Sequence, residues 1–297
     1  RVIKVNTRVF ESAKDLLNVE RSLLLRFLPR TREGDHLMAL IDFVRKLNRF
    51  PGNPALWNDR LFMLKTGDEL LDPLRVFVTD KEFVKIFVKS VVGDQYNVPT
   101  IAVLKTKNQV ESFAFPADCC IKPTHGSGKA LLRRANERLD LDLLKRWLEE
   151  NYYDLTREIN YRYLQPKIIV EPILFADANL CDYKFYCVDG VPRLIQVDFD
   201  RRTRHTRKMF DADWNDRGFT CNYPVWPGRL ERPGNLDAML DISSKLARHF
   251  NYIRVDLYTD GTNIFVGELT NCPGSGLSPF FPPESEAVAS GILFPES

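Results

Sequence analysis

Two carboxylates late in the chain have the types and spacing to bind a cation. Asp256 and Glu268 each lie in a short apolar run, and Asp260-Gly261 between the runs predicts the turn of a β-hairpin. Alternate residues of a strand share a face, so one carboxylate on each strand can aim at a single point, with Arg254 on the face of Asp256. Such carboxylates repel unless a cation separates them, and their oxygens suit Mg²⁺.

The loop after this hairpin has a composition that favours anion binding. Pro273-Gly274-Ser275-Gly276 offers backbone N–H groups to an anion. Cation ligands, an arginine and this loop together predict phosphate chemistry. A hairpin with acidic residues on its solvated face, followed by a Pro-Gly turn, is also an ordinary structural feature, so this segment alone leaves both interpretations open.

A second glycine-rich segment lies near the middle of the chain. Residues 124–129 read Thr-His-Gly-Ser-Gly-Lys, but Ala130 follows Lys129, so the segment is not a Walker A motif. A loop of this type can lie over a triphosphate between two strands, and Lys122 just before it would place an ammonium on the α- and β-phosphates. Gly-Ser-Gly loops are commonly only flexible turns, so the motif gains weight from its context.

Composition restricts the class of protein. The chain has 297 residues, of which 44% are hydrophobic, and this is enough for one large domain or two to three small ones. A net charge of +2 gives no bulk electrostatic reason to expect nucleic acid or membrane as a partner. No apolar run is long enough to span a bilayer, and no signal peptide pattern is present. Six scattered cysteines without a C-x-x-C pair argue against a zinc site and favour a cytoplasmic location.

Periodicity predicts an order of elements along the chain. Residues 1–75 are expected to be helical, with a break at 50–54, and to form a solvated cap. The remaining predictions are helices at 79–88, 139–151 and 236–249, strands at 98–104, 119–123 and 167–174, hairpins at 183–198 and 254–270, a basic loop at 201–208 and a polar, proline-rich tail.

The order of these parts resembles the ATP-grasp superfamily. A strand with Lys122 and a glycine-rich loop is followed by a helix, the strand ending in Glu171-Pro172-Ile173-Leu174, and the pieces Asp182-Tyr183-Lys184 and Arg254-Val255-Asp256. Residues 182–190, 196–201 and 267–276 resemble the TupA-like branch, which is associated with teichuronopeptide, capsule and other bacterial surface-polysaccharide synthesis. The resemblance covers roughly residues 76–285.

The resemblance implies an α+β fold, in which two α+β subdomains clamp ATP beside a helical N-terminal region. The implied divisions are 1–75 for the helical region, 76–120 for a segment preceding the ATP-grasp, 121–180 for the central lid subdomain and 181–297 for the C-terminal subdomain with the metal site. The implied cofactors are ATP and Mg²⁺ or Mn²⁺.

The resemblance also implies roles for individual residues. Arg254 and Lys122 would be catalytic, and Asp256, Glu268 and Thr270 would bind metal. The implied nucleotide contacts match the family's lysine motifs, glycine-rich loop, hinge and ribose-binding pair: Lys85, Lys122, His125, Gly126, Ser127, Gly128, Glu171, Ile173, Asp182 and Lys184. The expected contacts to substrate are Arg201, Arg204, Gly274 and Ser275.

Several of these residues have an equally ordinary structural interpretation. Lys85 lies among other lysines on a predicted helix, where a solvated surface is as good an explanation, and His125 fits a hydrogen-bonding role in its loop. The basic stretch 201–208 fits a solvated loop or a dock for an acidic substrate. One departure concerns the metal site, because Thr270 stands where many ATP-grasp ligases have a third ligand, Asn. Asn271 is expected to point away, since a strand alternates its faces.

The resemblance implies an ATP-dependent carboxylate–amine ligase that forms an amide through an acyl phosphate. The carboxylate would belong to a uronic acid of a surface glycan, and the partner would be an amino acid or another amine. A kinase of the same fold acting on a hydroxyl is the alternative, and a non-catalytic nucleotide-binding module is the third. A nucleic-acid-binding role through residues 201–208 ranks last, because that stretch holds no aromatic stacking partner.

Overall fold

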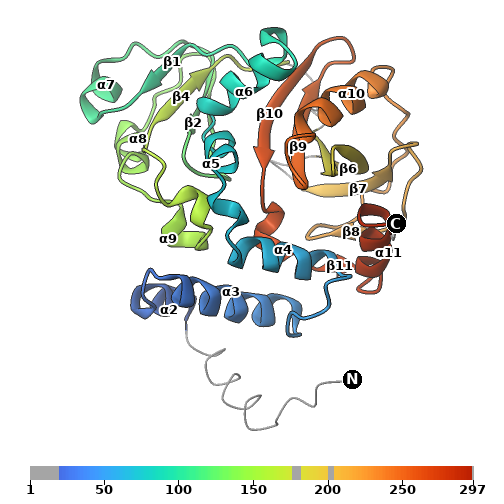
Figure 1. Ribbon diagram of the computed structural model, residues 1–297. Helices are drawn as coiled ribbons and strands as arrows, with labels where there is room; N and C mark the ends of the chain where they lie inside the picture. The colour runs from blue at the N-terminus through green and yellow to red at the C-terminus, as the bar shows by residue number, and fades with distance from the viewer. Residues whose placement is uncertain (1–19, 176–181, 200–203, 296–297) are drawn as a thin grey trace.

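The protein is built around two antiparallel sheets that stand on a base of helices (Figure 1). The structure, a computed structural model, describes residues 20–175, 182–199 and 204–295. Helices and strands mix along the chain, as the α+β prediction requires. Within the described residues, no helix is both long and apolar enough to cross a membrane.

The larger sheet has five strands in the order β10-β9-β5-β6-β7. Its strands are β5 (Asp182–Val188), β6 (Val191–Phe199), β7 (Thr206–Asp211), β9 (Tyr252–Thr259) and β10 (Ile264–Thr270). Both predicted hairpins are confirmed, since β5 pairs with β6 and β9 with β10. The basic stretch 201–208 was predicted to be a loop throughout; this was wrong for its last three residues, which begin β7 and pair with β6.

Alternation along the strands gives the large sheet one apolar and one mixed face. Phe185, Val197 and Val255 belong to a core formed with the helices α5 (Pro73–Thr79), α6 (Phe83–Val91) and α10 (Leu236–Ala247). The neighbouring residues of each strand point the opposite way. On that side, one half of the sheet, around Tyr186 and Leu194, is covered by apolar residues. The other half, around Lys184 and Asp256, carries polar side chains.

The smaller sheet has four strands in the order β1-β4-β2-β3. Its strands are β1 (Ala102–Leu104), β2 (Cys119–Pro123), β3 (Leu131–Arg133) and β4 (Ile168–Glu171), and α7 (Lys107–Ser112) and α8 (Leu141–Trp147) accompany it. The predicted strands at 98–104 and 167–174 are therefore shorter than expected. Because β1 pairs with β4, the small sheet draws on the segment before residue 121.

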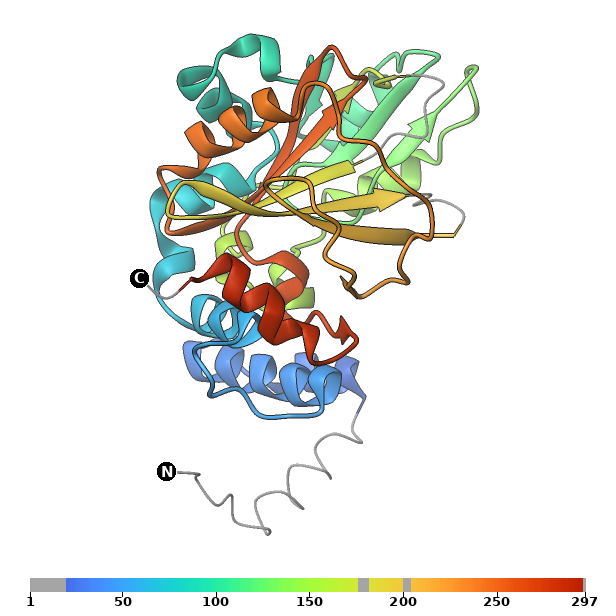
Figure 2. The same cartoon turned by 90° about the vertical axis from the view of Figure 1, so that its right-hand side faces the viewer.

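The N-terminal helices are part of the folded core rather than a solvated cap, so that prediction was wrong. They are α2 (Arg21–Phe27), α3 (Arg32–Leu47) and α4 (Trp57–Thr66), followed by the 3-10 turn η1 (Glu69–Leu71). Trp57 and Leu61 of α4 pack in one cluster with Tyr186 and Leu194 of the large sheet, while α3 packs beneath α4 (Figures 1 and 2). The apolar face of α4 explains the difference, because it needs a partner to bury it.

The C-terminal segment is also more ordered than its proline content indicated. The predicted tail contains the 3-10 turn η4 (Pro273–Gly276), β11 (Phe280–Phe281), which pairs with β8 (Thr220–Cys221), and α11 (Ser285–Leu293). Helix α11 contacts α4 and covers part of the large sheet (Figure 2). The remaining short elements are η2 (Asp94–Tyr96), α9 (Tyr153–Thr156) and η3 (Ile159–Tyr161).

Candidate active site

The polar half of the large sheet brings together acidic and basic side chains from three strands. Arg254 donates from Nε to Asp256 Oδ1 at 2.6 Å and from Nη2 to Asp256 Oδ2 at 2.7 Å. The same Nη2 lies 3.2 Å from Glu268 Oε1 and 3.0 Å from Thr270 Oγ1. Lys184 donates to Asp256 at 2.7 Å from the next strand. The two carboxylates and the arginine therefore meet at one point, which is the geometry that the hairpin pattern predicted.

A β-bulge at Gly267 places Glu268 on this face. The register between β9 and β10 shifts between Val266 and Glu268, so that Glu268 lies opposite Asp256. Strict alternation from Val266, whose side chain is in the core, would have turned Glu268 into the core as well. Gly267 is needed at the bulge, since a Cβ there would lie 2.5 Å from the ring of Tyr258.

The charges around these carboxylates set their protonation. Burial alone would raise the pKa of Glu268, but Lys81 and Arg254 hold that pKa at about 2. Burial raises the pKa of Asp256 above its usual value, against the opposing effect of Arg254 and Lys184. The site thus holds an ionised carboxylate next to one that is more basic than usual, and both sit among cations that favour an anionic ligand.

A second charged cluster joins α6 to the small sheet. Glu171, at the end of β4, is buried, and its Oε1 accepts from Lys85 at 2.5 Å while its Oε2 accepts from Lys122 at 3.0 Å. Burial opposes ionisation, but the two ammonium groups hold the pKa of Glu171 below its ordinary value. The structure thus brings Lys85, Lys122 and Glu171 together. Ile173, two residues beyond β4, is half-buried.

Lys81 is a site residue that the sequence reasoning missed. It precedes α6, donates to the Gly126 carbonyl at 2.5 Å and lies 3.8 Å from Glu268 Oε2, so it links the glycine-rich loop to the carboxylate pair. Burial lowers the pKa of Lys81. A signal was present, because Lys81 lies four residues before Lys85 at a helix start, a spacing that puts two side chains on one side of a helix.

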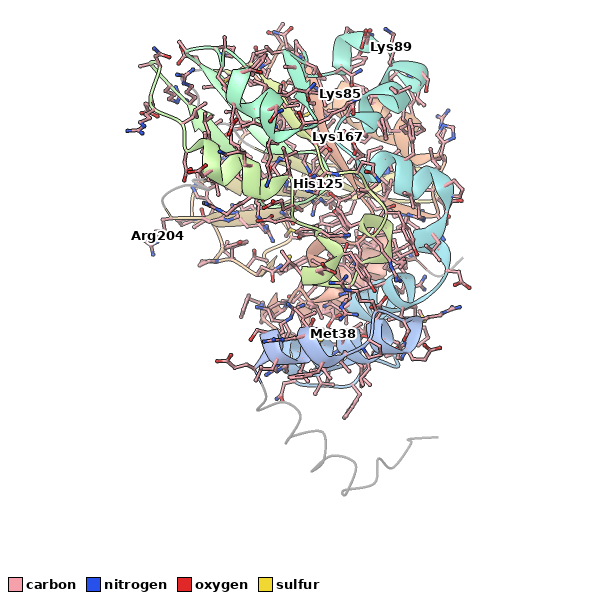
Figure 3. All side chains as sticks on the ribbon, turned by 90° about the vertical axis from the view of Figure 1, so that its left-hand side faces the viewer. Met38, Lys85, Lys89, His125, Lys167 and Arg204 are labelled. Atoms are coloured by element: carbon pink, nitrogen blue, oxygen red, sulfur yellow. The ribbon has the colours of Figure 1, made fainter. Side chains whose placement is uncertain are left out.

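His125 fixes the glycine-rich loop to the neighbouring backbone. The Lys167 N–H donates to His125 Nδ1 at 3.2 Å, which leaves the proton on Nε2 to donate to the Trp147 carbonyl at 3.0 Å. Figure 3 shows Lys85, Lys167 and His125 along one side of the molecule. Both ring nitrogens thus bind backbone, which gives His125 a structural role in this arrangement.

The next residues of the loop pass from the interior to solvent. Gly126 is buried and packs over the Tyr152 ring. Gly128 is exposed with φ +76°, a conformation that favours glycine.

The residues around the end of β10 divide between two sides. Thr270 donates to Glu268 Oε1 at 3.1 Å, whereas the Asn271 side chain binds Arg75 and Thr79 on the opposite side. The prediction that Asn271 points away is confirmed. The η4 turn follows, and its Gly274 and Ser275 both have φ +58°.

The basic stretch contributes less to this face than its composition indicated. Arg201 lies outside the described residues. Arg204 is exposed and stands well apart from Lys85 and His125 (Figure 3). Arg207 is buried and donates to Asp198 Oδ1 at 2.6 Å, so it is part of the structure of β6 and β7.

The donors at the carboxylate pair fit a hard divalent cation. Asp256 and Glu268 supply carboxylate oxygens, and the Thr270 hydroxyl adjoins Glu268. The described residues contain no group of three or more His, Cys, Asp or Glu side chains able to hold a metal by themselves. This agrees with the habit of Mg²⁺, which commonly binds one or two carboxylates and completes its shell with phosphate oxygens and waters.

This combination of a lysine-bearing strand, a glycine-rich loop and a carboxylate hairpin matches a known family. The sequence pattern of the TupA-like ATP-grasp family matches residues 61–290, well over half of the chain. The chain belongs to this family. The predicted membership is confirmed, and the match begins within α4, earlier than the resemblance suggested.

Solved structures similar to this chain include several ligases. D-alanine–D-alanine ligase from Bacillus anthracis is 18% identical with a TM-score of 0.42, over 78% of this chain and 66% of that one. The ATP-grasp ligase PsnB bound to a minimal precursor is 16% identical with a TM-score of 0.39, over 77% and 67%. Phosphoribosylamine–glycine ligase from Thermotoga maritima is 13% identical with a TM-score of 0.41, over 68% and 50%. This chain spans about two thirds or less of their lengths, and no curated protein sequence matches it.

Proposed function

We propose that the protein is an ATP-dependent carboxylate–amine ligase that uses Mg²⁺. The observation that carries the proposal is the convergence of Asp256, Glu268 and Arg254 at one point. Lys81, which precedes α6, contacts both Glu268 and the glycine-rich loop. Family membership supports ATP as the nucleotide. Lys81, Lys85 and Lys122 would hold the phosphates, the end of β4 would face the base, and Asp182 and Lys184 would meet ribose and phosphate.

In this proposal, the chain's own residues position charge for two successive steps. Mg²⁺, held by Asp256 and Glu268, would neutralise charge on the phosphates. Arg254 stabilises negative charge as the γ-phosphoryl group passes from ATP to a substrate carboxylate, giving an acyl phosphate and ADP. An amine then displaces phosphate, so that an amide forms. In this proposal, both steps take place at the polar half of the large sheet, between the two sheets.

The carboxylate substrate that we propose is a uronic acid of a surface polysaccharide, because the family is the TupA-like one. The decisive assay measures ADP and phosphate release with Mg-ATP, uronic acids or uronate-containing glycans, and pooled amino acids. Asp256→Asn and Glu268→Gln should each lower the rate by at least about 100-fold, as expected for loss of charge stabilisation in the transition state. Asp241→Asn, which changes an exposed carboxylate on α10, should leave the rate unchanged.

The requirement for substrates separates the alternatives. Turnover that needs both a uronate and an amine, with equal ADP and phosphate, is the expected result. ADP release without free phosphate, and without need for an amine, would replace this proposal with a kinase. Tight Mg-ATP binding without turnover on any carboxylate would favour a non-catalytic nucleotide-binding module.

A further inference from the structure

The polar half of the large sheet continues from the carboxylate pair to a second charged cluster on β6 and β7. Lys184 connects the two, because it donates to Asp256 and lies opposite Gln196 of β6. Gln196 donates to both oxygens of Asp198 at 3.1 Å, and Arg207 Nε donates to Asp198 Oδ1 at 2.6 Å. Asp198 is only 1% exposed. The binding of Mg-ATP proposed above makes no use of Gln196, Asp198 or Arg207.

His205 joins this cluster with its imidazole held on two sides. Its buried Nε2 lies 3.3 Å from Asp198 Oδ1, and its ring stacks on Tyr223 with 3.6 Å between the ring centroids. Arg207 shares both partners, because it binds Asp198 and lies over the Tyr223 ring. The second ring nitrogen, Nδ1, has no hydrogen bond to any described residue. The orientation of the ring is thus fixed, while the side chain stays 16% exposed and one nitrogen is left for a ligand.

Asp198 determines which nitrogen of His205 carries the proton. Burial alone would raise the pKa of Asp198, but a hydrogen bond from His205 and the charge of Arg207 hold that pKa well below its ordinary value. An ionised carboxylate only accepts hydrogen bonds, so the nitrogen that faces it, Nε2, carries the proton. Nδ1 of the neutral ring then has a free lone pair. A carboxylate behind an imidazole is an arrangement that orients a general base.

The position of His205 on the sheet fits the second step of the proposed reaction, for which no base has been assigned. Strand β6, which carries Asp198, lies two strands from β9, and this corresponds to roughly 10 Å at the usual strand spacing. Reacting atoms approach to about 3–3.5 Å, and a base lies about 2.6–3.2 Å from the atom that it deprotonates. A phosphoryl group at Arg254, the acyl carbon and the attacking nitrogen in succession therefore place the base on the order of 10 Å from Asp256.

We propose that His205 is the general base of the ligase and that Asp198 is its positioning residue. Most aliphatic amines arrive as ammonium groups at neutral pH, and an ammonium nitrogen has no lone pair with which to attack. Nδ1 of His205 accepts one proton from the ammonium group, so that the nitrogen becomes a nucleophile. This inference rests on the proposed ligase function, since it assigns the base of that reaction.

The bonds and protons of this step balance. The amine nitrogen attacks the carbonyl carbon of the acyl phosphate, the C–N bond forms, and the bond between the carbonyl carbon and the phosphate oxygen breaks. The departing phosphate takes a second proton from the nitrogen and leaves as hydrogen phosphate. His205 returns the first proton to solvent, so the imidazole is ready for the next turnover.

Two nucleophiles that differ in charge test the inference. The full chain and its His205→Ala variant are incubated with Mg-ATP, the uronic acids of the assay above, and either the pooled amino acids or hydroxylamine. Hydroxylamine is largely uncharged at neutral pH, so it attacks an acyl phosphate without help from a base and gives a hydroxamate. His205→Ala should lower amide formation by about 100-fold or more, as expected for the loss of a general base. Hydroxamate formation should be unchanged.

Three further measurements separate a base from a structural role. Free imidazole should restore part of the amide formation of His205→Ala, since it can occupy the space of the missing ring. Asp198→Asn should also lower amide formation without lowering hydroxamate formation, and its hydroxamate rate shows that the variant is folded. His249→Ala, at an exposed histidine that contacts Phe87, is the matched control and should change neither rate.

The results that would overturn the inference differ from those that would overturn the proposed function. Equal losses of amide and hydroxamate in His205→Ala would refute the base and indicate a contact to nucleotide or carboxylate instead, and an unchanged amide rate would refute it as well. Hydroxamate without amide in the wild-type chain would leave His205 no ammonium group to deprotonate, which also refutes the base alone. Neither product from any uronate would refute the proposed function and the base together.

Discussion

The Glu171 carboxylate holds two lysines of the proposed phosphate site in place, and replacing it with an amide should destabilise the fold. Glu171→Gln keeps the shape but removes the charge that pairs with Lys85 at 2.5 Å and Lys122 at 3.0 Å. The amide also turns an NH₂ group toward one ammonium. Removing one partner of a buried ion pair costs about 3–5 kcal/mol. Because the two lysines keep 16% and 21% of their side chains exposed, we expect a loss near the lower end, about 3 kcal/mol.

The pH dependence of this loss follows from the direction of the pKa shift. The pKa of Glu171 in the folded protein lies below its ordinary value of 4.5. The stabilisation is therefore complete above that value and is lost as the pH falls through the folded pKa. Wild type and Glu171→Gln should differ most at neutral pH and converge in acid.

Urea unfolding at several pH values provides the measurement. Glu149→Gln is the matched control, because Glu149 pairs with Lys107 on the surface and is 59% exposed. Its expected cost is below about 1 kcal/mol. If Glu171→Gln costs no more than this control, or if its cost persists unchanged in acid, the argument for the buried lysine–carboxylate cluster is wrong.

Two further substitutions test how the site is positioned. Gly267→Ala places a Cβ against the Tyr258 ring, so it should lower the free energy of unfolding in urea by about 1–3 kcal/mol and weaken Mg-ATP binding measured by calorimetry. The control Gly291→Ala, with no neighbouring atom within 4 Å, should be neutral or stabilising, and equal effects of the two substitutions would refute the bulge argument. Arg157→Leu removes a buried guanidinium that binds Asp35 and carbonyls at the end of α2, so it should expose α2 and α3 to limited proteolysis, whereas the exposed Arg146→Leu should not.

The sequence predicted the hairpin and its carboxylates because local rules govern them. Asp260-Gly261 set the turn, and period-two alternation put Arg254 and Asp256 on one face. The same rule, applied strictly, would have buried Glu268 beside Val266. The bulge at Gly267 corrects this. At that position the Tyr258 ring of the paired strand leaves no room for a Cβ, a restriction between strands that periodicity within one strand does not report.

The N-terminal helices show where local pattern was insufficient. Their mixture of leucines and basic residues predicts a solvated cap, yet α4 buries Trp57 and Leu61 against the large sheet. Which face of an amphipathic helix is covered, and by what, depends on partners distant in the chain. Lys81 was missed for a related reason, since its value comes from the Gly126 carbonyl and Glu268 that tertiary structure brings to it.

The N-terminal helices are held to the rest of the molecule by buried contacts. Arg157 and Tyr153 tie the segment that carries Glu158 to α2 and α3, through the carbonyls of α2 and through Asp35. Lys65 reaches the same place from α4. Because these contacts are buried, the helices are a structural part of the molecule rather than an appendage. Removal of these helices should therefore expose the residues of the large sheet that Trp57 and Leu61 cover, and should lower the stability of the whole fold, although the lysines and carboxylates proposed to hold Mg-ATP come from other elements.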